Sequence, residues 1–241
     1  HQHHAVQLIA LAGKYLIPRQ ADDSHTSMQY SASWEWIFGN ELPGGFRIAL
    51  HLPTLRIIII NRSKIPYTEF ALSCTTKTEA FALLRQKLES LEIDVTGLKN
   101  ELHYEIPGHE LDGEAAFMLD SDKYIRETIL YRHNAEIILN RLASEYDNAE
   151  PVRIWPHHFD TATIIPLRQN GDGTPATSIG LGWAIPDSMV EEPYFYLSYW
   201  TQESRVDFSG LPDPQHGKWI RSGWAGGVLK NSELLSANDP T

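Results

Sequence analysis

The sequence predicts an α+β fold with a largely antiparallel sheet and about three helices. Short runs of alternating apolar and polar side chains, typical of strands, follow one another through Pro- and Gly-containing turns. Three longer segments instead repeat their apolar residues at helical spacing. We therefore expect an antiparallel meander combined with separate helices.

The first 97 residues are expected to form one helix, a meander and a second helix. The first helix covers residues 5–17 and ends at Pro18, because proline cannot continue a helix. Strands are expected at residues 28–38, 46–52, 55–60 and 67–73. The second helix covers residues 77–91, and Thr76 and Glu79 form a capping box at its start.

The remaining residues are expected to form an irregular acidic connection, at 98–120, and a second half, at 121–241. A long helix at 122–146 opens this half, with a surface pair between Arg132 and Glu136. Its predicted buried stripe consists of Ile125, Ile129, Ile138 and Leu142. Strands are expected at 153–165, 179–185, 194–200 and 219–229. Both halves then read as a helix followed by three or four strands, which suggests a pseudo-repeat, although one continuous domain also fits.

The overall charge and the cysteine content limit the classes of partner. The net charge is −11, with 20 basic and 31 acidic residues, and no segment concentrates Lys and Arg. Nucleic acid is therefore not an expected partner, because binding phosphates requires a basic face. The apolar run at residues 5–12 is too short to span a membrane. Cys74 is the single cysteine, so the chain forms no internal disulfide bond, and we expect a cytoplasmic protein. We expect the side chain of Cys74 to be small and buried.

The segment at 153–165 carries the most concentrated functional residue types. If it is extended, His158 and Asp160 share one face, and Trp155 and His157 share the other. We expect other elements to pack on both faces of such a strand. Its buried polar side chains then need hydrogen-bond partners or a ligand. One interpretation is a general base with an orienting carboxylate or a metal ligand. The other is a core strand whose polar groups bond to neighbouring backbone.

A set of aromatic residues supplies a second candidate surface. Trp183, Tyr194, Tyr196 and Trp200, with Trp155, would form a stacking wall for a sugar, a nucleoside or another ring. A core edge or a protein interface is the alternative. Glu192 is a candidate acid, or a solvated carboxylate at a strand end.

Motifs for common cofactors are missing from the sequence. It contains no phosphate-binding glycine loop, no Gly-x-Ser-x-Gly elbow and no Cys-x-x-Cys pair. His103, His109, Glu110 and Asp112 lack the spacing of a known metal motif and are interpreted as a solvated loop. We therefore assign no metal and no cofactor, and nothing in the sequence indicates an oligomeric state.

The second half resembles a family of uncharacterised bacterial proteins of unknown function. The resemblance lies in the segment 155–162, which ends Phe-Asp-Thr-Ala, in Gly-Trp-Ala-Ile-Pro at 182–186, in Glu-Pro-Tyr-Phe-Tyr at 192–196, and in Trp224. This chain has Pro-His-His at 156–158 where the family has a Trp-Gly-Ser-like turn. The resemblance implies no activity.

Three hypotheses follow from these observations. The leading one is a small-molecule-binding protein with an aromatic and histidine-lined cavity. The second is a hydrolase or isomerase with His158 as base and Asp160 or Glu192 as its partner. The third is a protein-interaction module that uses the aromatic strand.

Overall fold

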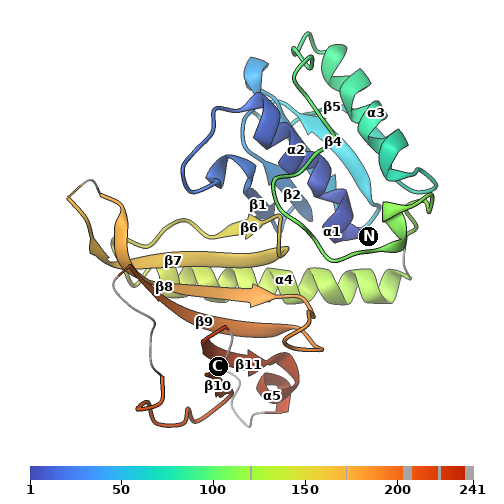
Figure 1. Cartoon of the computed structure of the whole chain (residues 1–241). Coiled ribbons are helices and arrows are strands. Elements are labelled where there is room, and N and C mark those ends of the chain that lie inside the picture. The colour runs from blue at the N-terminus through green and yellow to red at the C-terminus, as the bar shows by residue number, and fades with distance from the viewer. Residues whose placement is uncertain (120, 172, 203–207, 222–223, 237–241) are drawn as a thin grey trace. The chain divides into compact units, whose positions relative to one another are not determined.

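A computed structural model describes residues 1–119, 121–171, 173–202, 208–221 and 224–236. The chain divides into two compact units, shown in Figure 1. Unit 1 comprises His1–Tyr131 and Ile154–His158, and unit 2 comprises Arg132–Arg153 and Phe159–Thr241. Every strand pairing in the described residues is antiparallel, which confirms the predicted α+β class.

Unit 1 contains a sheet in the order β6-β1-β2-β3-β4-β5. Its strands are β1 Met28–Ser31, β2 Trp36–Gly39, β3 Arg47–His51, β4 Arg56–Ile60, β5 Pro66–Ala71 and β6 Arg153–Trp155. The expected meander is confirmed, but the strand expected at 28–38 is wrong, because a turn divides it into β1 and β2, which pair with each other. Tight turns at residues 32–35 and 52–55 connect β1 to β2 and β3 to β4.

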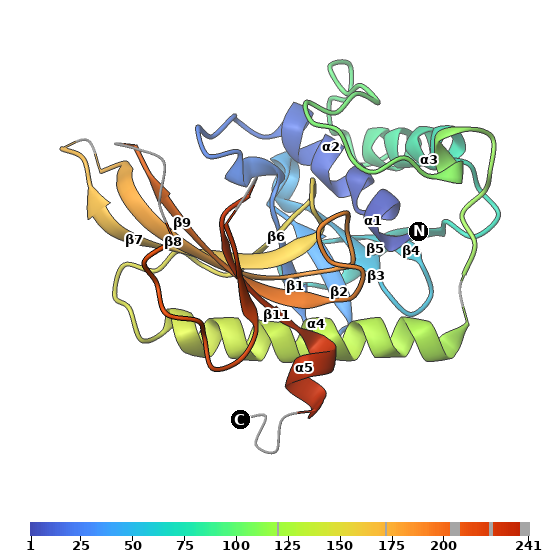
Figure 2. The same cartoon turned by 60° about the horizontal axis from the view of Figure 1, so that its bottom comes forward.

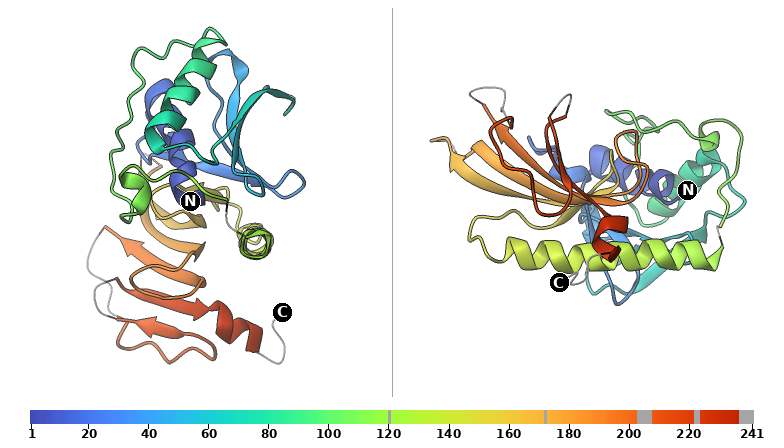
Figure 3. Two further views of the ribbon diagram at one scale, coloured as in Figure 1. Left: turned by 90° about the vertical axis from the view of Figure 1, so that its right-hand side faces the viewer. Right: turned by 90° about the horizontal axis from the view of Figure 1, so that it is seen from below.

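Helices cover one face of this sheet, as the left view of Figure 3 shows for α2 and α3. They are α1 Gln2–Ala5, α2 Gln7–Leu16 and α3 Lys77–Glu89. Helix α2 approaches β2 closely, because a Cβ atom on Gly39 would lie 2.5 Å from Ile9. The predicted capping box is confirmed: Thr76 and Glu79 bond each other's backbone N–H groups at the start of α3.

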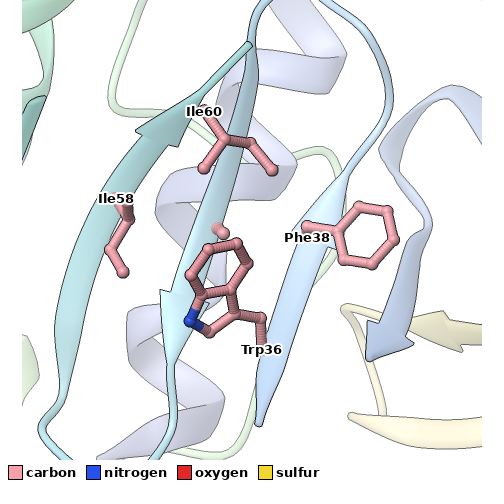
Figure 4. Packing of buried hydrophobic residues seen from close by; sticks show 5 residues of the cluster. Trp36, Phe38, Ile58 and Ile60 are labelled. Carbon is pink, nitrogen blue, oxygen red and sulfur yellow. The ribbon is translucent and has the colours of Figure 1, made fainter. Parts of the chain in front are cut away.

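The opposite face of the same sheet carries a buried apolar cluster, shown in Figure 4. Its members come from β2, β3 and β4: Trp36, Phe38, Ala49, Ile58 and Ile60. Because side chains alternate along a strand, Ile57 and Ile59 point to the helix side instead. The sheet of unit 1 is therefore apolar on both faces.

Shorter elements complete unit 1. These are the 3-10 helices η1 Ser24–Thr26, η2 Pro43–Gly45 and η3 Glu110–Asp112. Cys74 lies before α3 and is exposed, with a positive φ of 64°. The expectation that it is buried is wrong, because it sits in the turn between β5 and α3 rather than in a strand.

Unit 2 contains a sheet in the order β10-β11-β9-β8-β7, whose long strands are visible in Figure 2. Its strands are β7 Asp160–Gln169, β8 Pro175–Ala184, β9 Tyr194–Thr201, β10 Lys218–Ile220 and β11 Gly226–Lys230, followed by the helix α5 Asn231–Ser236. The strands expected at 179–185 and 194–200 are confirmed. Within the strand expected at 219–229, residues 222 and 223 lie outside the described part of the chain.

Helix α4, Asp122–Ala143, contributes residues to both units. Its buried positions recur every three or four residues: Ile125, Ile129, Arg132, Ala135 and Leu139. The prediction placed Arg132 on the surface and Ile138 and Leu142 in the core, and it was wrong for all three. Arg132 is fully buried, whereas Ile138 and Leu142 are 38% and 37% exposed. Among the described residues, no helix is both long and apolar enough to cross a membrane.

Candidate functional site

The segment at 153–165 is not one continuous strand. A turn at residues 156–159 separates β6 from β7, and Phe159 has a positive φ of 55°. Pro156 cannot donate to a strand ladder, and its carbonyl accepts a bond from the Gln7 amide at 2.8 Å. The prediction that His158 and Asp160 share a face of one strand is therefore wrong. The boundary between the two units falls between His158 and Phe159.

Trp155, His157 and His158 belong to unit 1, where their rings form a chain of contacts. The His157 ring lies 6.2 Å from that of Trp155, 4.6 Å from that of His158 and 5.7 Å from that of Tyr104. The Tyr104 hydroxyl in turn donates to Gln7 Oε1 at 2.8 Å, and burial raises its pKa. Because Gln7 also bonds Pro156, these contacts hold the turn against α2.

Asp160 and Tyr196 belong to unit 2 and lie in direct contact. The Tyr196 hydroxyl donates to Asp160 Oδ2 at 2.5 Å. Burial, and then the charge of Asp160, raise the pKa of Tyr196 well above its ordinary value. The contact depends on Gly182, because a Cβ atom there would lie 2.4 Å from the tyrosine ring. Trp200 shares the side of β9 that carries Tyr196, and it is 49% exposed.

Trp183 faces the other side of β8 and does not join this pair. Its side chain is 1% exposed and lies 5.3 Å from the Arg132 guanidinium. Arg132 also lies over the Phe159 ring at 4.2 Å and donates to Phe159 O and to Thr161 Oγ1. This arginine and its aromatic neighbours form a closed structural cluster.

Glu192 stabilises the start of α5. Its carboxylate accepts bonds from the Ser232 hydroxyl at 2.8 Å and the Ser232 N–H at 2.9 Å, and Lys230 Nζ lies 3.4 Å away. The bonds from Ser232 lower the pKa of Glu192, so the group is an anion at neutral pH. An anionic carboxylate with these partners is a poor general acid.

A hollow of about 720 Å³ opens at one end of the unit 1 sheet. It lies on the face that carries the buried apolar cluster of Figure 4. Its walls come from the turns before β2 and before β4 and from β2, β3, β4 and β5: Ala32, Ser33, Trp34, Glu35, Trp36, His51, Thr54, Arg56, Ile58 and Glu69. We call this feature the β-sheet hollow.

Two tryptophans form the aromatic wall of the β-sheet hollow. The rings of Trp34 and Trp36 are stacked, with centroids 4.9 Å apart and planes 25° apart. Trp36 is 4% exposed and anchors the pair in the sheet, whereas Trp34 is 49% exposed. A flat apolar surface therefore lies at the edge of the hollow, where a ring can stack on it.

Polar side chains follow the tryptophans across the sheet. The strand register places Trp36 beside His51, and His51 beside Arg56. The His51 ring nitrogen Nδ1 lies 2.6 Å from Thr54 Oγ1, and Arg56 donates to Glu69 at 2.7 Å. Burial lowers the pKa of His51, although nearby Glu35 and Glu69 oppose the shift. The hollow thus offers an uncharged imidazole and a partly exposed ion pair.

Sequence reasoning missed this site because it weighed the second half of the chain. The available signals were Trp34 and Trp36 at an interval of two residues, and His51 on the polar side of the alternating segment 46–52. The Arg56–Glu69 pair depends on the register between β4 and β5, and this register cannot be read from the sequence.

Comparisons with known proteins add no assignment to this geometry. No family model matches the chain, and neither a curated protein nor a solved structure matches it. The function has to be inferred from the residues of the site.

Proposed function

We propose that the protein binds a small molecule, and that the β-sheet hollow is its binding site. The observation that carries the proposal is the stacked pair of a buried Trp36 and a half-exposed Trp34 at the mouth of a hollow with polar walls. Small-molecule sites combine an apolar platform with a few placed polar groups, and this hollow has both. The class is the one expected from the sequence, but the residues are different.

The chemistry of the walls favours a neutral ring that carries hydroxyl groups. The ring stacks on Trp34, and the hydroxyls exchange hydrogen bonds with Arg56 and Glu69, which together supply donors and acceptors. Arg56 offsets the charge of Glu69, and Glu35 adds a further negative charge, so the walls disfavour an anionic ligand. A sugar fits this description best, and the neutral sugar of a nucleoside shares its chemistry.

The residues singled out from the sequence already have structural partners. Asp160 accepts from Tyr196, Trp183 is buried against Arg132, and Glu192 accepts from Ser232. The hydrolase or isomerase hypothesis needs Asp160 or Glu192 to act on a substrate with His158. Because both carboxylates already accept hydrogen bonds from other side chains, these contacts weigh against that hypothesis.

A ligand screen with matched variants tests the proposal. Monosaccharides and nucleosides are titrated into the purified protein, and binding is followed by calorimetry and by thermal shift. At a hundred times its dissociation constant a ligand adds about 2.7 kcal/mol of apparent stability. We expect Trp34→Ala to weaken binding of the hit by about tenfold, since stacking contributes about 1.4 kcal/mol.

Trp200→Ala is the matched control. Trp200 has the same exposed fraction as Trp34, 49%, but belongs to unit 2. The Trp200→Ala variant is expected to bind the hit with the affinity of the intact protein. Equal affinity of the Trp34 variant and the intact protein, or loss of binding in the Trp200 variant alone, would contradict the proposed site.

A further inference from the structure

Histidines from the first residues of the chain meet histidine and carboxylate groups of the connection before α4. The His109 ring lies 5.2 Å from the His1 ring and 4.8 Å from the His4 ring. Glu110 Oε1 lies 4.0 Å from His1 Nε2. Figure 1 shows the N-terminus beside this connection, and all of these residues belong to unit 1.

We propose that His1, His109 and Glu110 form a binding site for a divalent transition metal, with Zn²⁺ as the best fit. One ligand atom from each residue lies within 4.8 Å of the other two. Ligand atoms around one zinc ion lie roughly 3.4 Å apart, because each bond is about 2.1 Å long in a tetrahedral arrangement. Small rotations of these partly exposed side chains close the difference.

The donor set determines the class of metal. Two imidazoles and one carboxylate suit zinc and its first-row neighbours, whereas Ca²⁺ and Mg²⁺ prefer oxygen ligands alone. Three protein ligands leave the fourth tetrahedral position to water, as in open zinc sites. The site is therefore expected to discriminate strongly against magnesium.

The neighbouring carboxylate of Asp112 is held by other groups and does not compete for the metal. Lys77 Nζ lies 2.7 Å from Asp112 Oδ1, which keeps this second carboxylate in an ion pair. His4 Nδ1 lies 3.9 Å from the same Asp112 oxygen, so groups outside the three ligands hold this carboxylate.

Metal binding through Nε2 has to displace one hydrogen bond at each histidine, and at His1 this is the 3.5 Å bond from the Met118 N–H to Nδ1. His109 Nδ1 accepts from the Leu111 N–H at 3.2 Å, which caps η3. If His109 binds the metal through Nε2, its proton moves to Nδ1 and this bond is lost. We therefore expect a moderate affinity and a local rearrangement of η3 on binding.

Calorimetric titration with ZnCl₂ tests the site in the full chain carrying no added tag. One zinc ion per chain is expected, with much weaker binding of MgCl₂. Glu110→Gln and His109→Asn should each weaken zinc binding by about tenfold or more. Asparagine is chosen because its side-chain oxygen keeps an acceptor for the Leu111 N–H.

His103→Ala is the matched control, because His103 lies in the same connection and faces Asp23 at 3.4 Å, outside the cluster. It should bind zinc as the intact chain does, and thermal unfolding verifies that each variant is folded. Unchanged zinc affinity in both Glu110→Gln and His109→Asn would overturn the proposal, since the first four residues would then hold the metal alone. Absence of zinc binding to the intact chain would overturn it as well.

Discussion

Each unit of the molecule combines arginine and tryptophan side chains in one cluster or hollow, with opposite exposure. In unit 2, Arg132 is fully buried against Trp183, which is 1% exposed. In unit 1, the side chain of Arg56 is 36% exposed and lines a hollow with Trp34, which is 49% exposed. The residue types are the same, but Arg56 and Trp34 of unit 1 face solvent, whereas Arg132 and Trp183 of unit 2 do not.

The difference lies in what satisfies the polar groups. Arg132 donates to Thr161 and Phe159 within its own unit, so its bonds hold α4 on β7. Arg56 bonds a carboxylate at the surface, where water or a ligand can replace it. Arg132 and Trp183 therefore stabilise the fold of unit 2. Arg56 and Trp34 of unit 1 are available for binding.

The largest expected effect comes from replacing the two arginines by methionine. Arg132→Met removes the two buried hydrogen bonds that the guanidinium donates. Thr161 Oγ1 and Phe159 O then lose this donor. We expect it to lower the free energy of unfolding by about 3 kcal/mol or more. Arg56→Met should change it by less than about 1 kcal/mol, because exposed ion pairs contribute little. Urea denaturation of both variants measures the two values.

Two outcomes for the Arg132→Met and Arg56→Met variants would contradict this contrast between the units. If the two variants lose similar stability, Arg132 is not the structural centre described above. If Arg56→Met is the less stable of the two, the β-sheet hollow is itself part of the core.

A smaller effect is expected from Tyr196→Phe. The variant removes the hydroxyl that donates to Asp160, which should destabilise the protein by about 1.5 to 3 kcal/mol at neutral pH. Tyr67→Phe is the control, because Tyr67 is 66% exposed. A stability loss no larger than in the control would show that the Asp160 contact is not formed.

The pH dependence of the same variant follows from the raised pKa of Tyr196. The tyrosine of the unfolded chain ionises near its ordinary pKa of about 10, while the folded one stays protonated. The raised pKa of Tyr196 therefore stabilises the folded protein fully below about pH 10. Above that pH the free energy of unfolding falls by up to about 1.4 kcal/mol per pH unit. Alkaline denaturation of Tyr196→Phe should show a shallower loss of stability than the intact protein.

Local sequence signals predicted most of the elements. Thr76 and Glu79 located the start of α3, and the alternation at 46–52 located β3. These signals depend on neighbouring residues alone. The prediction failed at residues 156–159, where a turn interrupts the aromatic strand, and at Arg132, since a buried arginine breaks the rule that charged residues mark the helix surface.

The candidate site was harder to predict because it depends on contacts between distant segments. The β-sheet hollow requires the register that joins Trp36 to His51 and His51 to Arg56. The histidine cluster requires residues 1 and 109 to meet. For Glu192, no local pattern indicates that Ser232, 40 residues away, bonds its carboxylate.

The central claim is that the β-sheet hollow, rather than the aromatic cluster of unit 2, binds the small molecule. Nuclear magnetic resonance of the seven tryptophan indole N–H groups tests it in one titration with the sugar or nucleoside found in the screen. We predict a shift of the Trp34 and Trp36 signals, with Trp183 and Trp200 unchanged. Shifts of Trp183 or Trp200, while Trp34 and Trp36 stay in place, would contradict the account.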